Sequence, residues 1–357
     1  MSCLENLSNI TYPNSLVLNL TKLYNFRGKD YYYENVFKNY MDATIKKTIE
    51  IDTIYCCKIL NFNITEQRIK LLINKDSQPK NKQEMVVKNI RKILEIIQKQ
   101  GTEIELTDNE FLQMAMKLFE GYEKINYDYT IKDETYNLIT EKKKISKRDV
   151  MRSYLSKYKT VVKDYIEAIQ AAVCLYIDLS NDNVFTGQND FINLMILYSL
   201  IMSNRFYAFK FVSFFKKYYE NIKEFKSYQA IASKDWQYGT SKTELFNGFL
   251  IEIMIRTYEE VDKLVDDYHF DKNLKKKENV EAVIMKMPKT FTKQDVIDRC
   301  PNLSEATVRR ALENLHNEGK IESTGTGRSA KWIKIQEDEM FTANALQTNI
   351  FDFVSND

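Results

Sequence analysis

Residues 180–190 read Ser-Asn-Asp-Asn-Val-Phe-Thr-Gly-Gln-Asn-Asp, and residues 191–201 continue Phe-Ile-Asn-Leu-Met-Ile-Leu-Tyr-Ser-Leu-Ile. The first stretch is rich in turn-forming residues, which predicts a loop. The second is apolar on most sides, which predicts a helix at the centre of a bundle. A helical pattern from Ser146 to about Leu179 precedes the loop. This region therefore predicts a mainly α fold.

More helices are expected on both sides of this centre. Apolar residues at helical spacing predict helices over about 83–100, 208–230 and 241–268. Capping boxes at Thr107 and at Ser241 mark two helix starts. We expect residues 1–145 and 146–270 to be the two parts of one helical body.

A β-hairpin is expected within the first part. Between residues 125 and 138 apolar and polar residues alternate, and Asp133-Glu134 is taken as the turn. The hairpin would form a flap on the helical body.

Residues 279–335 predict a second module. Thr292 caps a short helix, residues 300–303 form a turn, and Ser304 caps a second helix that Gly319 ends. A hairpin with its loop at 323–328 follows. This order resembles a winged helix-turn-helix, joined to the body by a charged linker at 271–278.

Charge is concentrated in this module. Residues 271–335 carry fourteen Lys and Arg against nine Asp and Glu, whereas the tail 336–357 carries five acids and no base. Such a basic module is typical of a nucleic-acid partner. The candidate DNA-binding residues face outward on the second helix or lie in the wing: Thr307, Arg309, Arg310, Asn314, Arg328 and Lys331. Contact with protein remains the alternative, because Glu305 and Glu313 lie beside the same face.

Several function classes are disfavoured by composition. The chain has two histidines, nine glycines and no glycine-rich phosphate-binding motif. Five cysteines without a C-x-x-C pair fit reduced thiols in a cytoplasm and no zinc site. No apolar run is long enough to cross a membrane, and the first residues lack a secretory pattern.

The chain resembles the Fic (Fido) family over nearly its whole length. Residues 56–69 are similar to the family's inhibitory helix, S-x-x-I-E-G followed by T-x-x-R-[IL]. Residues 214–219 and 233–236 resemble the helices after its active site. The resemblance implies a Fic-like helical bundle with a β-hairpin flap and a C-terminal winged helix. It also implies an origin in enzymes that transfer AMP from ATP to a hydroxyl of a target protein.

The family's active loop, H-P-F-x-[DE]-G-N-G-R-x-x-R, falls on residues 182–193, where only Gly187 matches. The resemblance places Asp182 at the general base, Thr186 at the magnesium ligand, and Asp190 and Asn193 at the two phosphate-binding arginines. Gln188 and Asn189 complete the degenerate loop, and Leu60 takes the place of the inhibitory glutamate. Without cations or imidazole there, we expect no catalytic residue, no nucleotide cofactor and no metal.

The degenerate loop has two interpretations. It could merely join two helices, or Asp182, Gln188, Asn189 and Asp190 could line a surviving pocket for a neutral or cationic partner. For the whole chain we favour a non-catalytic DNA-binding regulator, whose body serves dimerisation or partner recognition. The alternatives are a protein-binding pseudoenzyme and an atypical nucleotidyl transferase.

The acidic tail contains one more motif. Gln347, Ile350 and Phe351 resemble the short peptide with which bacterial proteins dock on the DNA sliding clamp. The alternative is that Ile350 and Phe353 fold back on the body.

Overall fold

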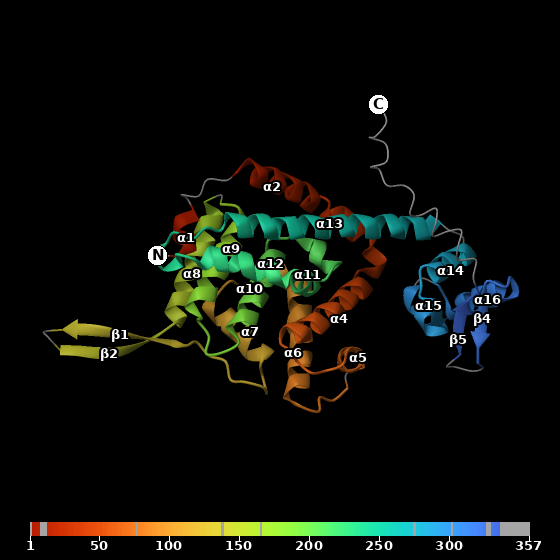
Figure 1. Cartoon of the computed structure of the whole chain (residues 1–357), viewed down its shortest axis with the longest axis horizontal. Helices are drawn as coiled ribbons and strands as arrows, with labels where there is room; N and C mark the ends of the chain where they lie inside the picture. The colour runs from red at the N-terminus through yellow and green to blue at the C-terminus, as the bar shows by residue number, and fades with distance from the viewer. Residues whose placement is uncertain are drawn as a thin grey trace. The chain divides into compact units, whose positions relative to one another are not determined.

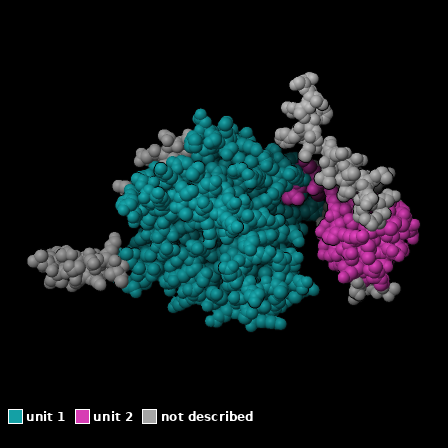
Figure 2. Space-filling model, in the orientation of Figure 1, with its two compact units in different colours: residues 1–263 teal, residues 264–357 magenta. Residues whose placement is uncertain are grey.

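The computed structural model describes residues 2–7, 13–75, 77–136, 139–164, 166–273, 276–300, 303–325 and 330–335. The side chains of 131–143 and 269–279 are not described. The chain forms two compact units, residues 1–263 and 264–357 (Figure 2).

The first unit is built from helices. Before the hairpin these are α1 (Cys3–Asn6), α2 (Asn14–Arg27), α3 (Asp30–Val36), α4 (Met41–Ile59), α5 (Glu66–Asn74), α6 (Lys82–Gln100) and α7 (Asp108–Leu118). After the hairpin come α8 (Arg148–Lys163), α9 (Ala168–Asp182), α10 (Asn189–Ser203), α11 (Phe214–Glu220), α12 (Ile222–Ser233) and α13 (Glu244–Asn273) (Figure 1). Short 3-10 turns lie at Lys38–Tyr40, Gly101–Glu103, Tyr207–Lys210 and Trp236–Tyr238.

The centre of this unit is α10, as the sequence predicts. All of its residues from Phe191 to Met202 are buried. The helix packs chiefly against α9, which is buried from Ile169 to Leu179. Two apolar helices therefore form the middle of the bundle, and the loop between them is held on both sides.

Helix boundaries were predicted with mixed success. Thr107 caps α7 by accepting a hydrogen bond from the Glu110 amide at 3.2 Å, as expected. The cap predicted at Ser241 is wrong, because α13 begins only at Glu244, directly after Thr243. The single helix predicted over 208–230 is interrupted, since Ser213 caps α11 and a new helix, α12, begins at Ile222.

The hairpin consists of β1 (Tyr129–Tyr136) and β2 (Ile139–Ser146), paired antiparallel. The predicted turn at Asp133-Glu134 is wrong, because both residues pair within the ladder, Asp133 opposite Lys142 and Glu134 opposite Glu141. Both residues therefore lie within β1 and not between the two strands.

The second unit contains α14 (Lys276–Met285), β3 (Thr290–Thr292), α15 (Lys293–Arg299), α16 (Glu305–Asn317), β4 (Ile321–Thr324) and β5 (Lys331–Lys334). The strands form an antiparallel sheet in the order β3-β5-β4. Its core includes Ile284, Val308, Leu312 and Leu315. The predicted order of helix, helix and hairpin is present, whereas α14 and β3 were not foreseen.

Candidate functional site

The loop between α9 and α10 begins at a capped helix end. Asn183 has a left-handed conformation with φ 47°, and its amide donates to the Leu179 carbonyl at 3.1 Å. The Lys147 ammonium donates to the carbonyls of Asp182 at 2.7 Å and Asn183 at 3.1 Å. A cation at a helix C-terminus stabilises the unpaired carbonyls there. The loop's first residues are therefore fixed in place.

The middle of the loop pairs with the segment that leads into the hairpin. Tyr127 and Phe185 form an antiparallel bridge, and their rings stack with centroids 5.3 Å apart. The Asp128 amide donates to the Val184 carbonyl, and the Thr186 amide to the Asn126 carbonyl, both at 2.9 Å. Val184 and Phe185 are buried. Loop and flap base thus form one connected structure.

Asn189 closes the loop. Its Oδ1 accepts from the Phe185 amide at 2.9 Å, and its Nδ2 donates to the Phe185 carbonyl at 2.8 Å. The Asn189 side chain therefore provides hydrogen-bond partners for both the backbone amide and the backbone carbonyl of the buried Phe185.

An acid faces the only residue that matches the Fic motif. A Cβ on Gly187 would lie 2.4 Å from Glu123 Oε1, so a larger residue there would require the Glu123 side chain to move. Gln188 Nε2 donates to Glu123 Oε2 at 2.9 Å. Glu123, which comes from the segment after α7, was not among the predicted site residues.

A pocket of about 480 Å³ lies beside the loop. Its wall consists of residues from the end of α4, the loop, α10, α11 and α12: Ile59, Leu60, Asn61, Asn183, Gln188, Asn189, Asp190, Phe191, Leu194, Tyr218, Ile222 and Lys226. Leu60 thus lines the same pocket as the degenerate loop. Of the other predicted loop residues, Gln188, Asn189 and Asp190 line the pocket.

The remaining loop residues named from the motif make other contacts. The Asp182 carboxylate accepts a hydrogen bond from the Tyr154 hydroxyl of α8. Thr186 Oγ1 accepts from the Asn126 amide at 3.1 Å. Asn193 is completely buried, and its amide atoms have no hydrogen-bond partner among the described residues. The positions of the base, the magnesium ligand and one arginine therefore do not face this pocket.

The inference that the pocket lacks cations is wrong, because Lys226 of α12 lines it. Lys226 is not a neighbour of the loop along the chain, because folding brings α12 to the pocket. Asp190 is the acid of the same wall. Burial, with a contribution from the Asp190 charge, raises the pKa of Tyr218 to about 12. The wall therefore carries one acid, one base, several amides and a neutral phenol.

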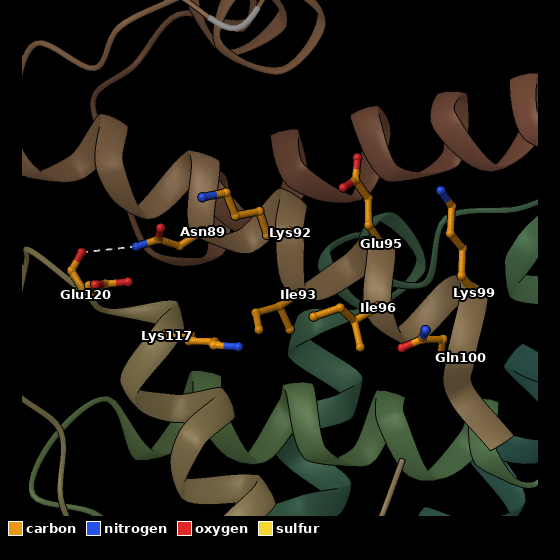
Figure 3. Close-up of a pocket in the computed structure, with 9 residues that line it drawn as sticks. All are labelled: Asn89, Lys92, Ile93, Glu95, Ile96, Lys99, Gln100, Lys117 and Glu120. Carbon is orange, nitrogen blue, oxygen red and sulfur yellow. Dashed lines mark hydrogen bonds between the residues drawn. The ribbon is translucent and has the colours of Figure 1, made fainter. Parts of the chain in front are cut away.

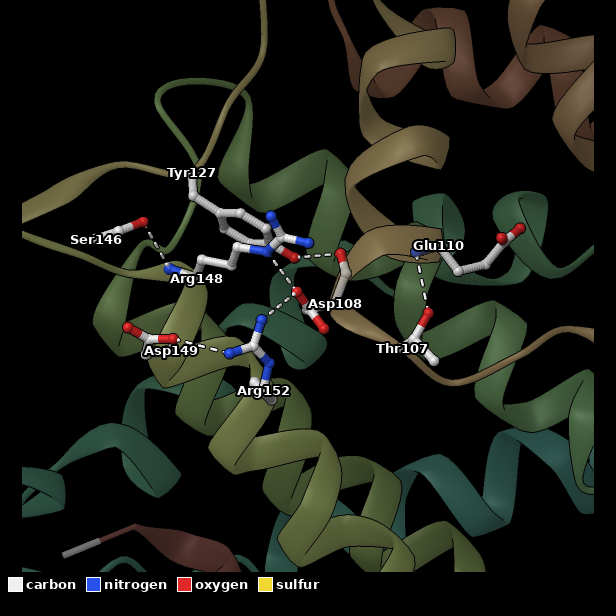
Figure 4. A network of polar contacts seen from close by, with 8 residues as sticks. All are labelled: Thr107, Asp108, Glu110, Tyr127, Ser146, Arg148, Asp149 and Arg152. Atoms are coloured by element: carbon white, nitrogen blue, oxygen red, sulfur yellow. Dashed lines mark hydrogen bonds and ion pairs between the residues drawn. The ribbon is translucent and has the colours of Figure 1, made fainter.

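A polar network ties the flap base to the helices (Figure 4). Asp108, at the start of α7, accepts from Arg148 Nε at 2.5 Å and pairs with Arg152 at 3.3 Å. The hydrogen bond from Arg148 holds the pKa of Asp108 below its usual value. The Tyr127 hydroxyl donates to the Asp108 carbonyl at 2.6 Å. The hairpin base is thereby connected to both α7 and α8.

The second candidate surface is α16. Its predicted core residues are buried, and the predicted outward residues Arg309, Arg310 and Asn314 are exposed. Thr307 is half-buried, with its hydroxyl 2.9 Å from that of Ser304. Lys331 on β5 is exposed, and Arg328 lies outside the described residues.

The acids beside this face are paired. Glu305 contacts the Lys293 ammonium at 2.6 Å, and Glu313 lies 3.5 Å from Arg309 Nε. Arg310 forms no ion pair with any described residue. The outward face of α16 therefore leaves the Arg310 guanidinium without an ion pair among the described residues, while each of its two acids has a basic partner.

Other kinds of site are not evident in the part of the chain that the structure describes. No group of three His, Cys, Asp or Glu residues there is placed to hold a metal ion. The five cysteines are buried thiols. No described helix is long and apolar enough to cross a membrane. The clamp-like residues Gln347, Ile350 and Phe351 lie outside the described residues.

Comparison with known proteins identifies structures with a similar fold. No family model matches the sequence, and no curated protein matches it. A Fic family protein from Desulfovibrio desulfuricans G20 is similar in structure with a TM-score of 0.55 at 12% identity, covering 92% of this chain and 98% of that one. A Fic domain containing signaling protein from Bacteroides thetaiotaomicron VPI-5482 gives 0.53 at 13% identity, covering 70% and 98%. At such identities the likeness concerns architecture alone: the chain has a Fic-like helical fold.

Proposed function

We propose that this chain is a non-catalytic Fic-like protein that regulates through DNA binding. In this proposal residues 276–335 are a winged helix, α16 enters the major groove, and the helical body serves dimerisation or recognition of a partner.

The exposed face of α16 is the observation that carries the proposal. Arg310 and Asn314 lie one turn apart on the exposed side of the helix, and both are side chains that read base edges. Pairing of Glu305 with Lys293 and of Glu313 with Arg309 lowers the repulsion that these acids would exert on phosphates. Lys331 lies on the strand that follows the wing loop and can contact the backbone.

The loop supports the non-catalytic half of the proposal. A polyphosphate placed against Gly187 would meet the Glu123 carboxylate, and Asp190 adds a second negative charge. Lys226 alone offers one charge-assisted contact, about 1.5–3 kcal/mol, where a triphosphate needs several. Asp182 is held by Tyr154 and does not line the pocket, so it is badly placed to accept a proton there.

DNA binding can be tested by fluorescence anisotropy with the DNA upstream of the protein's own gene at low salt. We expect the double variant Arg309→Ala/Arg310→Ala to bind at least tenfold more weakly, since each lost contact costs about 1–3 kcal/mol. Arg256→Ala is the matched control, because Arg256 is as exposed as Arg309 and is also paired with a glutamate four residues away. Absence of binding by the wild-type protein at low salt would reject the proposal.

A protein-binding pseudoenzyme is the second candidate, favoured by the direct connection between flap and loop. The bridge of Tyr127 with Phe185 would let a partner held by the hairpin also contact the loop. Replacing both residues by alanine should weaken capture of such a partner while leaving DNA binding intact. If capture is unchanged, the flap and loop do not act together.

An altered transferase remains the third candidate, favoured only by Lys226. Titration calorimetry with ATP and magnesium, followed by incubation with labelled nucleotides, tests it directly. We expect neither binding nor transfer above background, and Lys226→Ala should change nothing. Transfer that depends on Lys226 would overturn the non-catalytic assignment.

A further inference from the structure

A larger groove lies away from the loop, between α6 and α7 (Figure 3). It encloses about 520 Å³ and is lined on α6 by Asn89, Lys92, Ile93, Ile96 and Lys99 and on α7 by Lys117. These α6 positions recur every three or four residues, so they form one face of the helix. A smaller adjoining cavity shares Ile93, Ile96 and Lys117.

The floor of the groove is apolar and partly open to solvent. Ile93 is buried, whereas Ile96 keeps 39% of its surface exposed. Phe111 and Met114 of α7 continue the apolar floor in the adjoining cavity. Exposed aliphatic surface inside a concavity is a feature of surfaces that bind another chain.

The rim of the groove is basic. Lys92, Lys99 and Lys117 are exposed and form no ion pair with any described residue. Of the two acids at the rim, Glu95 already pairs with Arg91 Nε at 2.9 Å, which leaves Glu120 as the opposing charge. The groove is thus suited to an acidic segment with apolar anchors.

The chain itself contains such a segment. Residues 336–357 carry five acids and no Lys or Arg, and Leu346, Ile350 and Phe353 are spaced i, i+4 and i+7. This is the spacing with which an amphipathic helix places apolar anchors in a groove. We propose that the groove between α6 and α7 is the docking site of the acidic segment 336–357.

Dimensions and charge agree with this occupant. The lining of α6 from Asn89 to Gln100 extends about 16 Å at 1.5 Å per residue, which exceeds the span of three anchors at i, i+4 and i+7. The clamp-like residues Ile350 and Phe351 would then be covered when the segment is docked. The docking proposal does not depend on DNA binding.

Carbodiimide cross-linking of the full chain, read by mass spectrometry, tests the proposal. This reagent joins a carboxyl to an adjacent amine without a spacer, so it reports direct ion pairs. We expect Lys92, Lys99 and Lys117 to dominate the products with the acids of 336–357. Equal labelling of exposed lysines elsewhere, such as Lys223 and Lys234, would overturn the proposal, as would the absence of any such product. Mixing isotope-labelled and unlabelled copies shows which copy supplies the segment.

Variants separate docking from nonspecific charge attraction. Ile96→Glu should reduce the cross-link yield at least fivefold, whereas Ile231→Glu should not, although Ile231 of α12 is equally exposed at 41%. Ile350→Glu provides a second test that leaves the helical body untouched, and it should reduce the yield by the same factor. If both Ile96→Glu and Ile350→Glu leave the yield unchanged, apolar docking is rejected.

Discussion

The degenerate loop and the face of α16 differ in what their polar side chains do. In the loop, Asn189 bonds both backbone groups of Phe185, and Gln188 bonds Glu123. On α16, Arg310 and Asn314 point outward without ion pairs among the described residues. The loop's polar groups are mainly engaged in holding its own structure, whereas those of α16 remain available to a ligand.

This difference indicates where function resides. A side chain whose hydrogen-bond capacity is used internally cannot bind a ligand without giving up folding free energy. A solvated side chain exchanges water for the ligand at little conformational cost. We therefore expect substitutions in the loop to change stability and substitutions on α16 to change binding.

The largest expected contrast concerns pH. Buried carboxyls in the first unit have raised pKa values, about 7 for Asp30, about 7 for Asp52 and about 6 for Asp178, in each case chiefly because burial disfavours the charged form. The folded state thus holds more protons than the unfolded state between about pH 4 and 7. Each unit of pKa difference contributes about 1.4 kcal/mol, present at low pH and lost as pH rises through the folded pKa.

Each unit has one tryptophan, Trp236 in the first and Trp332 in the second, which permits separate measurement. Urea unfolding of Trp332→Phe reports the first unit, and we expect its unfolding free energy to fall by several kcal/mol as pH rises from 5 to 7.5. Trp236→Phe reports the second unit, for which no carboxyl with a raised pKa is found among the described residues, and we expect a flat profile. Parallel profiles in both units would contradict the assignment.

The same substitution in both regions gives the next contrast. Asn189→Ala leaves the buried amide and carbonyl of Phe185 without their partner, so the unfolding free energy should fall by about 2–4 kcal/mol. Asn314→Ala removes only an exposed side chain and should leave stability within about 0.5 kcal/mol while weakening DNA binding. Urea unfolding measures the stability of both variants, and fluorescence anisotropy measures their DNA binding. A destabilised Asn314→Ala, or an unaffected Asn189→Ala, would remove the distinction.

The sequence predicted the helices and their buried faces better than it predicted the contacts between distant segments. Helical periodicity located α10 and the buried face of α16 correctly, because apolar residues at helical spacing indicate which face of a helix is buried. Leu60 and Asp190, which the resemblance assigns to the inhibitory and arginine positions, line the same pocket. Helix position and buried face depend on the sequence of one segment, and the position assigned to Leu60 follows from the motif alignment.

Contacts between distant segments were not predictable in this way. Glu123 and Lys226 reach the loop region from other parts of the chain, and periodicity does not say which helices face each other. One signal was available: a glycine kept in an otherwise altered motif indicates that something approaches its backbone closely, here Glu123. Ion pairs of Glu305 and Glu313 were also missed, since pairing depends on rotamers that sequence does not reveal.

Asn193 allows a smaller test of the loop region. This residue of α10 stands where the Fic motif has an arginine, and its buried amide has no hydrogen-bond partner among the described residues. Asn193→Leu keeps a similar volume and removes the cost of the unpaired amide, so the unfolding free energy should rise by about 1–2 kcal/mol. Asn204→Leu is the control, because that amide bonds Tyr158 at 2.9 Å and its loss should destabilise. A drop in stability with Asn193→Leu would mean that the amide holds a ligand or water.

The smallest expected effect concerns the acid on α16. Glu313→Gln releases Arg309 from its ion pair and removes a negative charge from the exposed face, so DNA binding should become about two- to fivefold tighter at low salt. The gain should shrink as salt is raised, because added ions screen the lost repulsion. Anisotropy at two salt concentrations measures both. If α16 instead contacts protein, releasing Arg309 gives no such salt-dependent gain with DNA, and an unchanged affinity would favour that alternative.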